Sequence, residues 1–319
     1  MGAGSAICSA TLEESAMKRV VCLFLVLLVC SCASLQTSSE LSFEPLPVDP
    51  SDNLSGVLVT AADLSFTVYR DAPDEVVAEA AARDLARGYR IIAEAVGVSP
   101  AEVTWAQVAL SRDPQYQPPR RQEVTRWTVP LDPDGTLGPV GRSALYHLIP
   151  HEQVHSVQRS FGSLPRWYAE GMAVWAGFKA TSVLAPRIEA ERRAMLAAER
   201  RDATEPPNLM EWGGVSVKPE AVLRQMTPEQ RERKAADPSY SPPGPFSFTP
   251  DDFVSDESNT GARYAASLAL FEAIEAKAGT EQVTAWIVAV GRLPDPKKSE
   301  DITRLAKEVT GVDIATMLN

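Results

Sequence analysis

Cysteine and histidine are scarce in this sequence, and both are confined to short stretches. The cysteines all lie in the first tenth of the 319 residues, at Cys8, Cys22, Cys30 and Cys32. The rest of the chain therefore has no thiol nucleophile, no thiolate metal cluster and no disulfide bond. The histidines are His147, His151 and His155. Any chemistry that needs an imidazole is thus restricted to one short segment.

A positive net charge is also lacking, since the formal net charge is −11 and the acidic residues are scattered along the chain. Such a surface repels phosphate backbones, so no nucleic acid is expected as a partner. The composition, 45% hydrophobic and 23% charged, is typical of a folded protein. The length fits either two domains of roughly 150 residues or one enzyme with two lobes around a cleft.

The N-terminal region has the three-part pattern of a secretory signal. From Met17, the residues Lys18 and Arg19 give a charged start, residues 20–29 are apolar, and small residues follow. The apolar run is shorter than the stretch of about 20 residues that spans a bilayer. Residues 1–16 lack signal character, which favours Met17 as the start.

Residues 29–32, Val-Cys-Ser-Cys, resemble a bacterial lipobox, in which the cysteine after a small residue is acylated and becomes the new N-terminus. Cys32 fits because Ser31 precedes it. We therefore expect residues 1–32 to be a lipoprotein signal peptide with lipidation at Cys32; a plain signal peptide is the alternative. The resemblance implies an exported protein whose lipid chains anchor it to a membrane of the bacterial cell envelope. The lack of Asp after the anchor favours the outer membrane.

The hydrophobic pattern of the body predicts an α+β fold with a small mixed sheet in its N-terminal lobe. Residues 33–60 are expected to form a tether and residues 61–319 the folded domain, divided at residue 160 into two lobes. Residues 64–70, 103–111 and 124–129 are predicted strands, and residues 73–96 an amphipathic helix that ends at Gly97.

The C-terminal lobe is predicted to be mainly helical. Helices are expected at residues 188–201, 219–226, 262–278, 281–290 and 299–310. The proline-rich segment 202–260 is either a functional rim or disordered, and the sequence does not decide between them.

The histidine segment carries a pattern that suits metal-assisted hydrolysis. Residues 151–155 read His-Glu-Gln-Val-His. On a helix, His151 and His155 lie on one face, where both imidazoles can bind one ion. Glu152 is one step round the helix and can take a proton from a water bound to that ion. Two imidazoles together with a carboxylate suit zinc (Zn2+) best.

A second motif follows on a predicted helix that begins near Pro165. Its residues 167–173 read Trp-Tyr-Ala-Glu-Gly-Met-Ala. The two motifs in this order resemble the gluzincin peptidases, in which HExxH is followed by a Glu on the next helix. The resemblance implies that His151, His155 and Glu170 bind zinc, that Glu152 is the catalytic base, and that the site lies on a central helix between the two lobes.

Two departures from the gluzincin pattern leave alternatives open, and the first is a spacing from His155 to Glu170 that is shorter than in the thermolysin branch. Val174 stands where the thermolysin branch has an acid that orients a ligand imidazole, so another acceptor, such as a backbone carbonyl, is needed. His147 continues the spacing of the other histidines, but one straight helix cannot turn three such side chains onto one ion, and Pro150 lies between them. We interpret His147 as a packing residue or as a support for a ligand, and not as a third imidazole ligand. No histidine remains to stabilise the oxyanion, so Tyr264 is the candidate, with core packing as its alternative.

The pattern as a whole predicts a zinc-dependent hydrolase that cleaves peptide bonds of a peptide or protein substrate in the cell envelope. A lipoprotein that binds metal without catalysis, as a binding or assembly factor, is the alternative from another class. Hydrolysis of a non-peptide amide is a third reading, because pocket walls cannot be read from one sequence.

Overall fold

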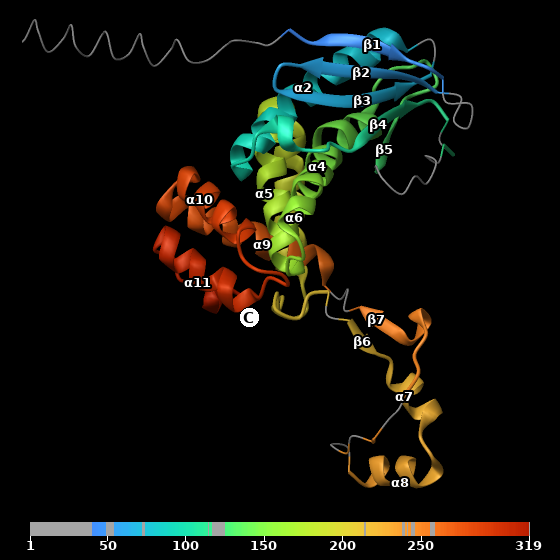
Figure 1. Ribbon diagram of the computed structural model, residues 1–319, viewed down its shortest axis with the longest axis vertical. Helices are drawn as coiled ribbons and strands as arrows, with labels where there is room; N and C mark the ends of the chain where they lie inside the picture. The colour runs from blue at the N-terminus through green and yellow to red at the C-terminus, as the bar shows by residue number, and fades with distance from the viewer. Residues whose placement is uncertain are drawn as a thin grey trace, which may run out of the picture. The chain divides into compact units, whose positions relative to one another are not determined.

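A five-stranded mixed sheet and a mainly helical C-terminal region make up the α+β architecture of the chain (Figure 1). The computed structural model describes residues 40–318 except 49–53, 72–73, 114, 117–124, 214, 238–239, 241, 244–245 and 256–258. The predicted signal peptide and Cys32 lie outside the described residues. Among the residues described, no helix is long and apolar enough to cross a membrane.

The sheet has the strand order β1-β2-β3-β4-β5, with antiparallel pairing from β1 to β3 and parallel pairing from β3 to β5. The strands are β1 (Ser42–Leu46), β2 (Ser55–Ala61), β3 (Leu64–Arg70), β4 (Gln107–Ser111) and β5 (Arg126–Pro130). Alternating Leu64, Phe66 and Val68 point one face of β3 into the core, which confirms the strand that the pattern predicts. The pairing of β3 with β4 confirms that the next predicted strand lies beside it.

The expected tether over residues 33–60 is wrong from Ser42 onward, because β1 and β2 extend the sheet there. β1 is an edge strand, where the missing N–H of Pro45 is tolerated. Val59 of β2 is fully buried and pairs with Phe43 on one side and Phe66 on the other. The residues of β2 do not by themselves show which side chains are buried. Pairing with β1 and β3 on its two edges makes it part of the sheet.

Helix α2 (Glu75–Val96) packs on the sheet, as its periodicity predicts. Its Tyr89 is fully buried between two aromatic residues: the ring of Phe66 lies 5.0 Å away edge-on and that of Trp105 is stacked at 4.5 Å. The helix ends at Gly97, where φ is 74° and a Cβ would lie 2.6 Å from Val288 Cγ2. Only glycine fits both the left-handed backbone and this close approach.

The helical region begins at α3 (Pro139–Ser143), and α5 lies at its centre. A π-helical turn, η2 (Ala144–Leu148), follows α3. The longer helices of the region are α4 (Ile149–Gln158), α5 (Arg166–Leu184), α6 (Pro186–Asp202), α9 (Thr260–Ala278), α10 (Thr280–Gly291) and α11 (Ser299–Thr310). Trp167, Tyr168 and Trp175 of α5 are buried, and the ring of Tyr168 contacts both Phe271 and Trp286. The helices predicted at 188–201, 262–278, 281–290 and 299–310 are confirmed.

The proline-rich segment contains short elements. They are β6 (Val215–Val217), α7 (Pro219–Gln225), α8 (Pro228–Ala236) and β7 (Phe253–Ser255), with β6 antiparallel to β7. Helix α7 confirms the expected helix, whereas α8 was not predicted. A capping box between Thr227 and Gln230 starts α8 and is readable in the sequence as T-P-E-Q. Single 3-10 turns occupy Pro100–Glu102, Arg159–Phe161, Pro250–Asp252 and Ala315–Met317.

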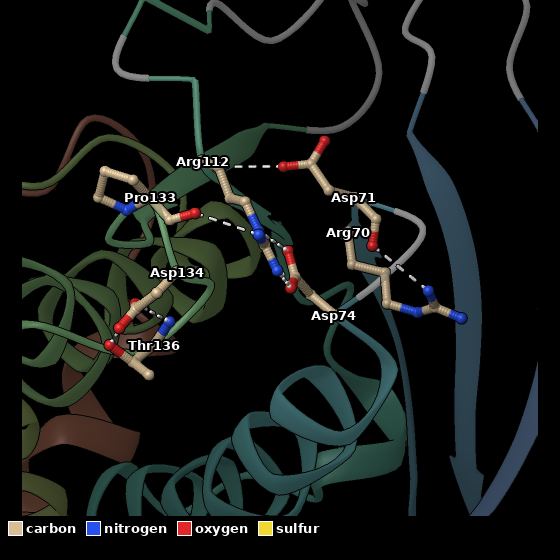
Figure 2. A network of polar contacts seen from close by, with 7 residues as sticks. All are labelled: Arg70, Asp71, Asp74, Arg112, Pro133, Asp134 and Thr136. Carbon is tan, nitrogen blue, oxygen red and sulfur yellow. Dashed lines mark hydrogen bonds and ion pairs between the residues drawn. The ribbon is translucent and has the colours of Figure 1, made fainter.

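Arg112, directly after β4, links three segments at one end of the sheet (Figure 2). Its Nε donates to Asp74 Oδ2 at 2.9 Å, at the start of α2, and its Nη1 donates to Pro133 O at 3.1 Å. Its backbone N–H donates to Asp71 Oδ2 at 2.9 Å, just after β3. Asp74 is almost fully buried, so this ion pair satisfies a carboxylate that would otherwise be costly to bury.

Gln153 fastens α4 to the sheet and to α2. Its fully buried side chain accepts from Ala106 N–H, and its amide donates to Ala106 O and to Tyr89 Oη, all at 2.9 Å. Because Gln153 lies between His151 and His155, these bonds hold the turn of α4 that carries both histidines against Ala106, the residue before β4.

Replacing Gln153 by Met should lower the free energy of unfolding by about 3 kcal/mol, because the backbone groups of Ala106 and the hydroxyl of Tyr89 lose their partner. Urea unfolding followed by circular dichroism measures the change. A loss below about 0.5 kcal/mol would contradict this role of the amide.

Candidate metal centre

Proline shapes the helix that carries the histidines. Pro150 has no N–H to donate to the preceding turn, and that turn is π-helical, with the Ile149 N–H bonded to Ala144 O. A wider turn accommodates the proline ring without ending the helix. Pro150 therefore falls between His147 and the two following histidines, as the sequence suggests.

Three side-chain atoms from α4 and α5 meet at one point. His151 Nε2 lies 3.2 Å from His155 Nε2, and Glu170 Oε2 lies 3.3 Å from the first and 3.4 Å from the second. The side chains of His151 and Glu170 are 12% and 14% exposed, and that of His155 is 31% exposed. Among the described residues, these three form a group of His, Cys, Asp and Glu side chains close enough to hold one metal ion.

The geometry of this group fits a tetrahedral zinc ion. Four ligands at about 2.0–2.1 Å from such an ion lie about 3.3–3.4 Å apart, close to the three distances between the atoms here. Glu170 Oε2 is buried and, within the part of the chain that the structure describes, meets the two imidazoles without forming a hydrogen bond of normal geometry. A cation between the three atoms would satisfy that oxygen and both imidazole lone pairs.

Close packing of α4 on α5 brings the three atoms together. Gly177 of α5 lies against the backbone of α4, where an added Cβ would be 3.1 Å from His151 N. The short connection after α4 then brings Glu170 back across the histidine face. The second carboxylate oxygen of Glu170 faces Arg166, with Nε 3.8 Å from Oε1. Arg166 and the imidazoles thus hold opposite ends of one carboxylate.

Charge and burial act on these groups in opposite directions. Burial raises the pKa of Glu170, but the two histidines outweigh it and hold the carboxyl well below its usual range. Burial lowers the pKa of His155, but Glu170 and Gln158 raise it above its usual value. In the metal-free protein the cluster is therefore held by attraction between the carboxylate and the imidazoles.

Gln158, at the end of α4, provides the acceptor that the sequence left open. Its Oε1 lies 2.8 Å from His155 Nδ1, and its Nε2 donates to Ala169 O at 2.7 Å. The sequence suggested a backbone carbonyl as the acceptor. The group beside His155 Nδ1 is instead the side-chain amide of Gln158, which itself bonds to the carbonyl of Ala169. The spacing of three residues from His155 to Gln158 is the signal that could have identified it.

Glu152 and Tyr264 line one cavity beside the cluster. The cavity has a volume of about 380 Å³ and is also lined by His147, Leu148, His151, Val174, Arg192, Met195, Leu196, Glu199, Thr260 and Gly261. Burial raises the pKa of Glu152, although both neighbouring histidines lower it. A carboxylate with a raised pKa beside a metal site is suited to accept a proton.

Tyr264 of α9 lies beside His151 of the cluster. Its ring centroid lies 6.0 Å from that of His151 and 4.9 Å from that of Trp212. Burial and the charge of Glu170 raise the pKa of Tyr264 well above its usual range, so the hydroxyl keeps its proton. The Arg166 guanidinium lies over the Trp212 ring at 5.2 Å. The sequence did not single out Trp212 or Arg166: the first matters through its ring contact with Tyr264, and the second through its ion pair with Glu170.

His147 is separate from the three-atom cluster, in agreement with its interpretation as a packing residue. Its ring lies 5.6 Å from that of Phe178 and forms part of the cavity wall. Burial, with further contributions from the charges of Arg192 and His151, lowers the pKa of His147 to about 4. The ring is therefore neutral near neutral pH.

Comparison with known proteins gives only distant matches. No protein-family model matches the sequence, and no curated protein matches it. Among solved structures, the M1 zinc metallopeptidase of Deinococcus radiodurans is 15% identical, with a TM-score of 0.37, and a Glu-to-Ala mutant of that enzyme is 14% identical, with a TM-score of 0.40. Each match covers 87% of this chain and 51% of the other, so the chain spans about half the length of those proteins. TM-scores this low do not establish a common fold.

Replacing His147 by Phe should make the free energy of unfolding fall less as the pH is lowered from 6.5 to 4. The folded state holds the pKa of His147 at about 4 against 6.5 for the unfolded chain, so the unfolded state binds the proton first as the pH falls. Stability is thus complete above pH 6.5 and declines toward pH 4, by about 2 kcal/mol for a partly exposed ring. Chemical denaturation of both proteins at pH 7.5 and pH 4.5 measures the difference, and parallel curves would contradict the assignment.

Proposed function

We propose that this chain is a zinc-dependent peptidase. One observation carries the proposal: a buried carboxylate oxygen, for which the described residues offer no hydrogen-bond partner, lies 3.3 and 3.4 Å from two imidazole nitrogens. Glu152 and a cavity lie directly beside that group. The proposed zinc ligands are His151, His155 and Glu170.

Zinc held by these residues would acidify a water molecule and polarise the carbonyl of the bond to be cleaved. Glu152 would accept a proton from the water as the water oxygen adds to the carbonyl carbon, and would pass it to the amine nitrogen as the C–N bond breaks; its raised pKa suits both transfers. Tyr264 keeps its hydroxyl proton and donates a hydrogen bond to the oxyanion that forms on the substrate. Arg166 holds the outer oxygen of Glu170 and keeps its other oxygen toward the imidazoles.

The cavity beside the proposed zinc site supports a peptide with a large apolar side chain as substrate. Leu148, Val174, Met195 and Leu196 supply apolar wall, and two of them, Leu148 and Met195, are 40% and 41% exposed. Exposed apolar side chains gathered in a cavity are typical of a binding site. The charges of Arg192 and Glu199 also border the cavity and can contact polar groups of a peptide backbone.

We also propose that the enzyme acts in the cell envelope and that lipid chains on Cys32 anchor it to a membrane. The support for this part is the charged, apolar and small-residue order of the N-terminal sequence and the Ser31-Cys32 pair. A peptide or protein exposed on the same side of that membrane is the proposed substrate.

Replacing Glu152 by Gln should leave one bound zinc per chain and lower peptide hydrolysis by at least about a hundredfold, because the proton acceptor is lost and the ligands remain. His155→Ala should lose both zinc and activity. Metal analysis of each purified protein, together with cleavage of casein, measures these effects.

Casein cleavage that a chelator abolishes and zinc restores separates the peptidase from a metal-binding protein without catalysis. Stoichiometric zinc without hydrolysis of any peptide would favour the binding or assembly factor. Full activity of the Glu152→Gln protein would rule out the proposed base.

Replacing Met195 by Glu should lower kcat/KM for peptides with a large apolar side chain about tenfold more than for peptides with a small one, because a charge then stands in an apolar wall. The matched control is Met317→Glu, since Met317 is similarly exposed at 37% and does not line the cavity. Equal effects of the two substitutions on both peptide sets would argue against a substrate pocket here.

A further inference from the structure

We infer that Gln158 is a positioning residue that selects one tautomer of His155 and so keeps the Nε2 lone pair of that ring free for a metal. The inference rests on the proposed zinc site and adds the residue that prepares one of its ligands. Gln158 would orient this imidazole without an acid. The residue that the gluzincin resemblance suggested for that role, Val174, has an apolar side chain and cannot accept a hydrogen bond.

The backbone of α5 fixes which way the Gln158 amide points. Ala169 O can only accept a hydrogen bond, so the amide group 2.7 Å from it must be the NH2. The other end of the same amide, the oxygen, then faces His155 Nδ1 at 2.8 Å. An oxygen there accepts a hydrogen bond, which places the ring proton on Nδ1 and leaves Nε2 without one.

Burial makes this selection strong. Gln158 is only 7% exposed, so water cannot readily substitute for either partner. Reversing the amide would place its oxygen against Ala169 O and its NH2 against His155 Nδ1. That arrangement loses one hydrogen bond and gains a repulsion between two buried oxygens. The tautomer of His155 is thus coupled to a backbone carbonyl of the neighbouring helix.

The same side chain acts on two of the proposed ligands. Ala169 directly precedes Glu170 in α5, and His155 lies one turn before Gln158 in α4. One amide therefore ties the backbone beside the carboxylate ligand to the imidazole ligand. Because the amide is neutral, it orients the ring without adding a second negative charge near the zinc site.

Gln158→Met removes the acceptor and keeps a side chain of similar length. The full-length protein, freed of metal and held at pH 9, gives three imidazole signals in long-range 1H–15N correlation spectra, one per histidine. We expect His155 to be an Nδ1–H tautomer in the unaltered protein and to shift toward the Nε2–H tautomer in the variant. The same tautomer in both proteins would overturn the inference.

Two further variants separate positioning from structure. Gln153→Met alters the other buried glutamine of α4, which bonds to Ala106 and Tyr89 and not to a histidine. It should destabilise the protein and leave the His155 tautomer unchanged. Gln158→Glu keeps an acceptor oxygen and loses the donor to Ala169, so it should retain the Nδ1–H tautomer. A shift of the tautomer with Gln153→Met, or loss of the Nδ1–H form with Gln158→Glu, would contradict the inference.

Zinc affinity gives a second readout, measured by competition with a chelator. Gln158→Met should weaken zinc binding by about 10- to 100-fold. If the unaltered protein binds no zinc, the proposed function fails, and the tautomer measurement still decides the role of Gln158. If the unaltered protein binds zinc and the variant binds it equally well, the inference fails while the proposed function stands.

Discussion

The site depends on one electrostatic constraint, the convergence of three electron-rich atoms in a buried place. Two imidazole nitrogens and one carboxylate oxygen lie 3.2–3.4 Å apart, and no hydrogen bond to the oxygen is formed by the residues that the structure describes. Such an arrangement is unfavourable unless a cation or protons hold it together. The surrounding structure supplies the rigidity that keeps the three atoms in place.

That rigidity comes from polar side chains that reach between elements. Gln153 bonds α4 to the start of β4, and Gln158 bonds it to the backbone of α5. At the start of α5, Trp167 Nε1 donates to Ser299 Oγ of α11 at 3.0 Å. Helix α4 is thus attached to the segment before β4 and α5 to α11, so the positions of the three side chains depend on contacts with both parts of the core.

Strong local patterns made part of the molecule predictable. The periodic apolar residues of α2 and the alternation in β3 identify both elements, and the capping glycine at 97 marks the end of the helix. β1 and β2 were missed because their pattern has meaning only when neighbouring strands cover it, as Val59 shows. The short elements between residues 202 and 260 escaped in part for the same reason, since many prolines obscure local periodicity.

The sequence by itself determined the chemical types at the site: the spacing of His151 and His155 puts both rings on one helical face, whatever the fold around them. The sequence also named Glu170 and Tyr264 as candidates, but only tertiary structure brings them beside those rings and places Gln158, not a backbone carbonyl, against His155. The physical reason is that some features depend on residues close in the sequence and others on residues far apart in it. Helical periodicity is fixed by the local backbone, whereas contacts between helices depend on how close their surfaces can pack, as Gly177 against His151 illustrates.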